Sequence, residues 1–496
     1  MPDRPTRPHG RGPRQRSRTA PAQRTRAAEP TRFAAYTLLR AVAEGAYANL
    51  ELPQILRRRR LEGRDAAFTT ELAFGTLRWQ GLYDKVIEVA AGRPVERLDP
   101  AVLDVLRLGV HQMLGMRVAP HAAADQTVGL ARTVASQGAG GLVNAVLRRV
   151  GERSLEEWVE EVAPRDGGSA ALAVRHSHPE WVVKALRAAL LGHGRATPET
   201  VDAELDALLA ADNVPPVVHL VARPGLATVE ELLEDADAEA SPGSPVGAVL
   251  HGGDPGRIAA VRDGRAAVQD EGSQHLALAL AAVDVPDDAP ARWLDLCAGP
   301  GGKAGVLGAL ALQRGADLTA VEVSEHRADL VRSSLAALTR RAEDAGRSVE
   351  VRTADGREIG EDEPASYAKV LVDAPCTGLG ALRRRAEARW RRTPADLASL
   401  GPLQRSLLAS ALDAVAPGGV VAYATCSPHV AETRFVVGDV VKKRDDVEVI
   451  DARPFVRDAA GEQLAELGDG PYVQLWPHVH GTDAMFLAFL RKRADA

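Results

Sequence analysis

The stretch ARWLDLCAGPGGKAGVLGALAL, residues 291–312, decides the fold of the last third of this chain. A short apolar run is followed by glycines and then by apolar residues at helical spacing, which predicts a strand, a tight turn and a helix. The same order returns in DLTAVEVSEHRADLVRSSLAAL, residues 317–338. Because strands that alternate with helices form parallel sheets, we expect an α/β domain of the Rossmann type over residues 286–494.

Three more apolar runs in this region predict buried strands, and each ends in a polar turn. They are VEVRTADGRE (349–358), YAKVLVDAPC (367–376) and GGVVAYATCSP (418–428). Ligands of parallel sheets bind at the carboxyl ends of the strands. All three cysteines of the 496-residue chain, Cys297, Cys376 and Cys426, fall at such ends. They are too few for a disulfide framework or a four-thiolate zinc site, so we expect free thiols with a shared function or, alternatively, small buried apolar side chains.

The glycine turn GPGGKA, residues 299–304, matches the pattern G-x-G-x-x-A, and Glu322 ends the next strand. Glycines allow close approach of the backbone to a nucleotide, and an acid at that position accepts hydrogen bonds from ribose hydroxyls. The pattern alone suits a nicotinamide cofactor or S-adenosylmethionine. A phosphate-binding Walker loop is excluded, because Cys297 stands where its first glycine belongs and Ala304 where a serine or threonine should hold magnesium.

The remainder of the chain divides into three further parts. Residues 1–29 contain eight arginines between Arg4 and Arg26 with no acid in that stretch, which predicts a disordered basic tail. Residues 30–165 carry apolar side chains at helical spacing, which predicts an all-α domain. Residues 170–285 mix helical patterns with the strand-like PPVVHLVARPG, and we expect a small α+β domain there.

Charge is distributed unevenly, although the net charge is only −6. The cluster RRRAEARWRR, residues 383–392, interleaves six arginines with a tryptophan, which favours an RNA contact over a merely solvated face. The predicted RNA-binding residues are Arg383, Arg384, Arg389, Trp390 and Arg391. No apolar run is long enough for a membrane span and no signal peptide is evident, so we expect a cytoplasmic protein.

The combined motifs resemble those of RNA cytosine-carbon-5 methyltransferases, and within that family those of the RsmB-type branch that acts on 16S rRNA. DLCAGPGGK, DAPCTGLG and YATCSP are similar to the family's catalytic motifs, and QDEGSQ to the segment before them. Residues 30–165, which close with NAVLRR, resemble a NusB-type RNA-binding domain. The resemblance implies S-adenosylmethionine as cofactor and 16S rRNA as partner. We also expect a monomer and no metal.

The resemblance also implies a role for each candidate site residue. Cys426 would attack carbon 6 of the cytosine, Asp373 would hydrogen-bond nitrogen 3, and Cys376 would assist release of the product. The implied cofactor-binding residues are Cys297, Ala298, Gly299, Pro300, Gly301, Gly302, Lys303, Glu322, Asp355 and Asp373.

Three alternatives remain open at this point. A tRNA cytosine-carbon-5 methyltransferase would use the same motifs. A noncatalytic RNA-binding or antitermination factor could carry a decayed methylase domain, although decay gives no reason to keep both cysteines. A nicotinamide-dependent oxidoreductase is compatible with the glycine turn alone. The chain also departs from the family pattern in the middle region, where VHLVARPG stands in place of an Arg-x-Asn segment.

Overall fold

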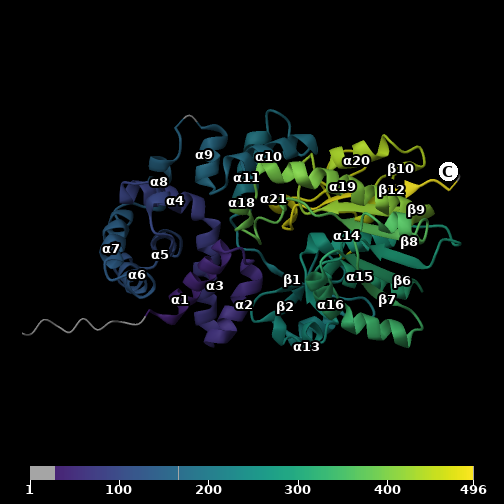
Figure 1. Ribbon diagram of the computed structural model, residues 1–496, viewed down its shortest axis with the longest axis horizontal. Coiled ribbons are helices and arrows are strands. Elements are labelled where there is room, and N and C mark those ends of the chain that lie inside the picture. The colour runs from purple at the N-terminus through teal and green to yellow at the C-terminus, as the bar shows by residue number, and fades with distance from the viewer. Residues whose placement is uncertain (1–27, 166, 495–496) are drawn as a thin grey trace, which may run out of the picture.

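The structure is a computed structural model that describes residues 28–165 and 167–494. The predicted basic tail lies outside the described residues except for its last two positions. Figure 1 shows the N-terminal helices at one end of the molecule and a large sheet with its helices at the other. No helix in the described part of the chain is long and apolar enough to cross a membrane.

The N-terminal unit is entirely helical, as predicted. Apolar side chains at helical spacing turn inward, and Leu38, Leu72, Val105 and Leu147 are completely buried in one core. The unit contains α1 (Pro30–Ala43), α2 (Ala48–Arg59), α3 (Gly63–Arg78), α4 (Gln80–Ala91), the 3₁₀ turn η1 (Val95–Arg97), α5 (Pro100–Val110), the π-helical turn η2 (His111–Gly115), α6 (Pro120–Val134), α7 (Ala139–Val150) and α8 (Leu155–Val162).

The middle region is an α+β unit built on a small sheet. Its four strands pair antiparallel in the order β2-β3-β1-β4, and the predicted strand in PPVVHLVARPG is β1. The elements are α9 (Gly168–Arg175), α10 (Glu180–Gly192), α11 (Val201–Ala211), β1 (Val218–Ala222), α12 (Val229–Asp235), β2 (Ala238–Ala240), β3 (Gly247–Leu250), η3 (Pro255–Arg257), α13 (Ala259–Arg262) and β4 (Ala266–Val268).

The C-terminal unit is a sheet with helices on both faces. Its elements are α14 (Glu271–Ala282), β5 (Arg292–Asp295), α15 (Gly302–Gln313), β6 (Asp317–Glu322), α16 (Glu325–Asp344), β7 (Val349–Thr353), α17 (Ile359–Asp362), β8 (Tyr367–Asp373), α18 (Ala388–Arg391), α19 (Pro394–Ala414), β9 (Val415–Thr425), α20 (Arg434–Val441), β10 (Val447–Ile450), η4 (Arg453–Phe455), β11 (Val473–Gln474), α21 (Pro477–His480) and β12 (Phe486–Lys492). Side chains along β8 alternate between two cores: Leu371 packs with α14–α16, and Val370 and Val372 pack with α19 and α20.

The strand order of the large sheet is β10-β12-β9-β8-β5-β6-β7, with β11 beside β12. Strands β5 to β9 are parallel, as the sequence predicts. The expectation of a parallel sheet is wrong at one edge, where β12 runs antiparallel to both β9 and β10. No full crossover helix joins β10 to β12, and an antiparallel return needs none.

Helix α14 lies at the boundary between the middle region and the C-terminal unit. Its apolar residues Leu276, Ala277 and Leu280 are buried in the same core as Trp293 of β5. The division at 30–165, 170–285 and 286–494 stays a prediction. From this packing we propose that the last unit includes α14 and begins near residue 270.

Candidate active site

The carboxyl ends of the parallel strands bring the predicted motifs to one edge of the sheet. Strands β8 and β9 are neighbours, and Asp373 stands opposite Ala424 in their register. The loops that follow therefore lie side by side, and the Sγ atoms of Cys376 and Cys426 are 3.5 Å apart. Both cysteines are partly exposed, so the pair is open to a ligand from the edge of the sheet.

The two thiols have different electrostatic surroundings. The hydrogen bond between the two sulfurs, in which either thiol could be the donor, lowers the pKa of Cys426 and raises that of Cys376. The positive charges of Lys303 and Arg385 also lower the pKa of Cys426, whereas the carboxylate of Glu432 helps to raise the pKa of Cys376. Since the thiolate is the reactive form, the surroundings favour Cys426 as the nucleophile and Cys376 as a protonated partner.

A lysine–carboxylate pair lies beside the cysteines. Lys303, in the first turn of α15, donates to Asp373 Oδ2 over 2.7 Å. Burial lowers the pKa of Lys303, but the Coulomb attraction and hydrogen bond of Asp373 outweigh burial and raise it. Behind this pair, burial and the nearby Asp373 raise the pKa of Asp295 to about 7. The Lys303–Asp373 pair can offer a polar ligand both a hydrogen-bond donor, the ammonium, and an acceptor, the carboxylate.

The glycine turn is packed too tightly to accept side chains. A Cβ atom on Gly299 would lie 2.2 Å from Oε2 of Glu322, and Gly301 has a φ of +105° that disfavours other residues. The turn leads directly into α15, whose first backbone N–H groups face the edge of the sheet. At the start of the turn, burial raises the pKa of Cys297 well above its usual range, so this thiol stays protonated.

The two acids predicted to hold the nucleoside lie at the ends of neighbouring strands. Glu322 ends β6, is almost completely buried, and accepts from the backbone N–H of Ser324. Arg327 lies 3.3 Å from Glu322 and also donates to the carbonyl of Gly299. Asp355 follows β7, where its carboxylate accepts hydrogen bonds from Arg357. A buried acid beside a glycine turn fits a cofactor that carries ribose hydroxyls.

Sequence reasoning did not identify Glu432, which is buried behind the cysteine pair. Its carboxylate accepts hydrogen bonds from Thr377 and Ser427, the residues that directly follow the two cysteines. A glutamate six residues after a cysteine in a predicted loop matches no sequence pattern that would indicate a role in the site. The arrangement becomes apparent only because β8 and β9 are adjacent.

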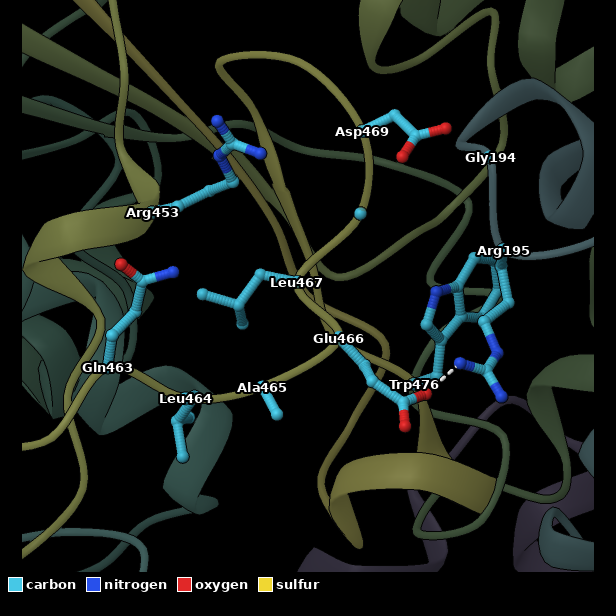
Figure 2. A pocket seen from close by; sticks show the side chains of 11 residues that line it. Gly194, Arg195, Arg453, Gln463, Leu464, Ala465, Glu466, Leu467, Asp469 and Trp476 are labelled. Carbon is cyan, nitrogen blue, oxygen red and sulfur yellow. Dashed lines mark hydrogen bonds and ion pairs between the residues drawn. The ribbon is translucent and has the colours of Figure 1, made fainter.

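A separate hollow of about 290 Å³ lies away from this site. Figure 2 shows Arg195 joined to Glu466 at its wall, next to Trp476, with Arg453 on the opposite side. Arg195 also pairs with Glu204, and Arg453 pairs with Asp451. Because these arginines are already ion-paired and none of the predicted site residues lines the hollow, we do not assign it to the active site.

The arginine cluster differs from its prediction. Arg389 has no exposed surface, and its guanidinium donates to the carbonyls of Arg78, Ser177 and Asp212 and to the side chain of Asn213. These hydrogen bonds join α18 to the N-terminal and middle regions and leave no exposed guanidinium surface, which argues against the RNA-binding role predicted for Arg389.

Arg383 also departs from the prediction, since it is buried and donates to the carbonyl of Gly481. The other three predicted RNA-binding residues are partly exposed. Arg384 is paired with Asp483, Arg391 donates to the carbonyl of Val42, and Trp390 covers Gly81. Their role in RNA binding stays a prediction.

Replacing Arg389 by alanine is expected to destabilise the fold rather than to weaken RNA binding selectively. The change would leave several buried carbonyls without a donor, at a cost of about 3 kcal/mol or more. Thermal unfolding would measure this loss, with Arg392→Ala as a control that removes only a half-exposed arginine paired with Asp396. An unchanged melting temperature for Arg389→Ala, together with weaker RNA binding, would restore the original prediction.

Comparison with known families agrees with this architecture. Residues 282–491 match the family model described as 16S rRNA methyltransferase RsmB/F, and residues 29–152 match the NusB family. The fold and the matched regions therefore define an RNA methyltransferase with a Rossmann-like catalytic domain and an N-terminal NusB domain.

The most informative relatives extend over the full chain. A putative methyltransferase of Mycobacterium tuberculosis is 49% identical, with 98% of this chain and 99% of the relative covered. The ribosomal RNA small subunit methyltransferase B of Pseudomonas syringae is 32% identical, with 93% and 97% covered. The crystal structure of PH0851 has the same fold, with a TM-score of 0.74, 22% identity and coverage of 94% and 99%. The chain belongs to the RsmB/F family of rRNA methyltransferases.

Proposed function

We propose that this protein transfers a methyl group from S-adenosylmethionine to carbon 5 of a cytosine in 16S rRNA. The observation that carries the proposal is the distance of 3.5 Å between the Sγ atoms of Cys376 and Cys426, at the ends of adjacent strands. Two cysteines with opposite pKa shifts suit a reaction that needs one thiolate to attack and a second group to assist its departure.

The first step is attack by the Cys426 thiolate on carbon 6 of the cytosine. Carbon 5 is a poor nucleophile in the free base, and a new S–C6 bond moves electron density toward it. Asp373 hydrogen-bonds the ring at nitrogen 3, and a proton from the Lys303–Asp373 pair reaches that nitrogen as the S–C6 bond forms, which neutralises the negative charge on the ring. Lys303, 2.7 Å from Asp373, keeps that carboxylate in place.

Bound S-adenosylmethionine supplies the electrophilic methyl group, which carbon 5 accepts. The glycine turn, residues 297–303, would hold the methionine end of the cofactor, Glu322 would hold the ribose, and Asp355 would lie near the adenine. The fit of these residues rests on the buried carboxylate of Glu322 beside Gly299, where no side chain could be accommodated.

The last step releases the methylated base. A water molecule takes the proton on carbon 5, which restores the C5–C6 double bond while the S–C6 bond breaks and its electron pair returns to Cys426. The proton on nitrogen 3 returns to the Lys303–Asp373 pair. Cys376 assists this step from its position 3.5 Å from the leaving sulfur. The products are the methylated RNA, S-adenosylhomocysteine and the free Cys426 thiolate.

The cofactor assignment predicts a defined loss when Glu322 is changed. Glu322→Ala should weaken S-adenosylmethionine binding by roughly 1–3 kcal/mol, because ribose hydroxyls would lose their acceptor. Isothermal titration of S-adenosylhomocysteine would measure the effect, with Glu325→Ala as the control, since this exposed acid begins α16. Equal affinity in wild type and Glu322→Ala would rule out the ribose contact.

The RNA substrate can be identified with isotopically labelled S-adenosylmethionine. Small-subunit rRNA and tRNA from a strain that lacks the gene are incubated with the protein, digested to nucleosides and analysed by mass spectrometry. We expect labelled 5-methylcytidine from the rRNA. Label in tRNA alone would establish the tRNA alternative, and binding of RNA without transfer would favour the noncatalytic factor.

A further inference from the structure

We propose that Glu432 is a positioning residue that fixes the distance between Cys376 and Cys426 by joining their two loops. The inference deepens the proposed function, because it depends on the two thiols acting together. The hydrogen bonds of the Glu432 carboxylate go to Thr377, Ser427 and Gln404 and not to either sulfur. Glu432 acts through the residues that follow each cysteine.

The carboxylate of Glu432 makes hydrogen bonds to both loops at once. Oε1 accepts from the backbone N–H of Thr377 over 2.8 Å, and Oε2 accepts from the Thr377 hydroxyl over 2.5 Å. Oε2 also accepts from the hydroxyl of Ser427 over 2.6 Å. The two hydroxyls lie 3.1 Å from each other. One carboxylate therefore bridges the loop after β8 and the loop after β9.

Surrounding contacts hold Glu432 itself in place. Gln404 of α19 donates to Oε1 over 3.3 Å and to the carbonyl of Pro375, just before Cys376, over 2.9 Å. The hydroxyl of Tyr423, in β9, donates to the backbone carbonyl of Glu432 over 2.7 Å. Glu432 is 1% exposed, so water cannot readily replace these contacts.

The network fixes both cysteines from behind, through the residue that follows each of them. The backbone N–H of Gly380 donates to the carbonyl of Cys426 over 2.9 Å, which is a further link between the loops. Reactions between positioned groups are sensitive to displacements of about 1 Å, which can reduce a rate by roughly 100-fold. We therefore expect loss of the Glu432 bridge to displace the two cysteines and to lower the rate of methyl transfer.

Two substitutions separate positioning from charge. Glu432→Ala removes the bridge. In Glu432→Gln the amide oxygen can keep the two acceptor contacts of Oε1, and the amide nitrogen can donate to Thr377 and Ser427, since hydroxyls both donate and accept. The glutamine variant therefore loses the charge but keeps the bridge. Glu363→Ala is the matched control, because Glu363 accepts from Tyr367 and Arg292 near the opposite end of β8.

The first measurement is the turnover of rRNA with S-adenosylmethionine. We expect kcat of Glu432→Ala to fall by roughly 100-fold with little change in the KM for RNA. Glu432→Gln should retain kcat within about tenfold of the wild type, because its geometry is kept. Equal losses in both variants would mean that the charge, not the bridge, matters, and would overturn the proposal.

The second measurement is the reactivity of the two cysteines, and it needs neither RNA nor cofactor. It therefore tests the role of Glu432 separately from the proposed methylation of cytosine. Iodoacetamide labelling followed by peptide mass spectrometry gives the ratio of the labelling rates of Cys426 and Cys376 within each variant. We expect the preference for Cys426 over Cys376 to be lost in Glu432→Ala, reduced but retained in Glu432→Gln, which keeps the bridge and loses the charge, and unchanged in Glu363→Ala. An unchanged preference in Glu432→Ala, with only a lower melting temperature, would reduce Glu432 to a structural role.

Discussion

Replacing Cys426 by serine is expected to stop methyl transfer, with a fall in kcat of at least about 10⁴-fold, as removal of an essential nucleophile does elsewhere. A serine hydroxyl stays protonated near neutral pH and is far less polarizable than a thiolate. The groups that lower the pKa of Cys426, its hydrogen bond with Cys376 and the charges of Lys303 and Arg385, have no comparable effect on such a weak acid.

The measurement is methyl incorporation from labelled S-adenosylmethionine into rRNA. Cofactor binding, followed by titration with S-adenosylhomocysteine, should be unchanged in Cys426→Ser. Cys297→Ala provides the contrast: it lies in the glycine turn, so it should alter cofactor affinity and leave the chemistry intact. An active Cys426→Ser variant would remove the covalent mechanism.

Replacing Cys376 by serine should impair a different step, the release of the methylated base. Attack by Cys426 remains possible, but loss of the assisting thiol should slow release by roughly 10²-fold or more, within the range for a lost acid–base group. A protein–RNA complex should then accumulate in the presence of S-adenosylmethionine. It would appear as a slowly migrating band on a denaturing gel and be absent from the double variant Cys376→Ser/Cys426→Ser.

This experiment distinguishes the two thiols because their surroundings shift their pKa values in opposite directions. The carboxylate of Glu432 helps to raise the pKa of Cys376, whereas the positive charge of Lys303 lowers the pKa of Cys426. A complex trapped by Cys426→Ser instead would reverse the assignment and make Cys376 the attacking residue.

The sequence predicted the features that depend on local patterns. The strands that end in Asp373 and in Thr425 were evident from their apolar runs, and the ends of parallel strands necessarily meet at one edge. The neighbouring positions of Cys376 and Cys426 followed from this topology. The glycine turn was likewise predictable from the pattern GPGGKA. The structure gives the physical reason for the glycine, since close contact with Glu322 excludes a side chain at Gly299.

Features that depend on contacts between distant segments could not be predicted in the same way. Arginines clustered around a tryptophan suggested RNA, but Arg389 is enclosed by carbonyls from residues 78, 177 and 212. Charge in a sequence does not reveal which side chains a neighbouring domain will cover. The same limit applies to Glu432, whose partners belong to two loops, and to the antiparallel strand β12.

The most direct test of the central claim is to identify the protein atom bonded to RNA in the complex trapped by Cys376→Ser. The gel band is excised, the RNA is digested with ribonuclease, the protein is digested with trypsin, and the modified peptide is sequenced by mass spectrometry. We expect a nucleotide on Cys426 that contains cytosine and one added methyl group. A nucleotide on any other residue, or a trapped base other than cytosine, would contradict it.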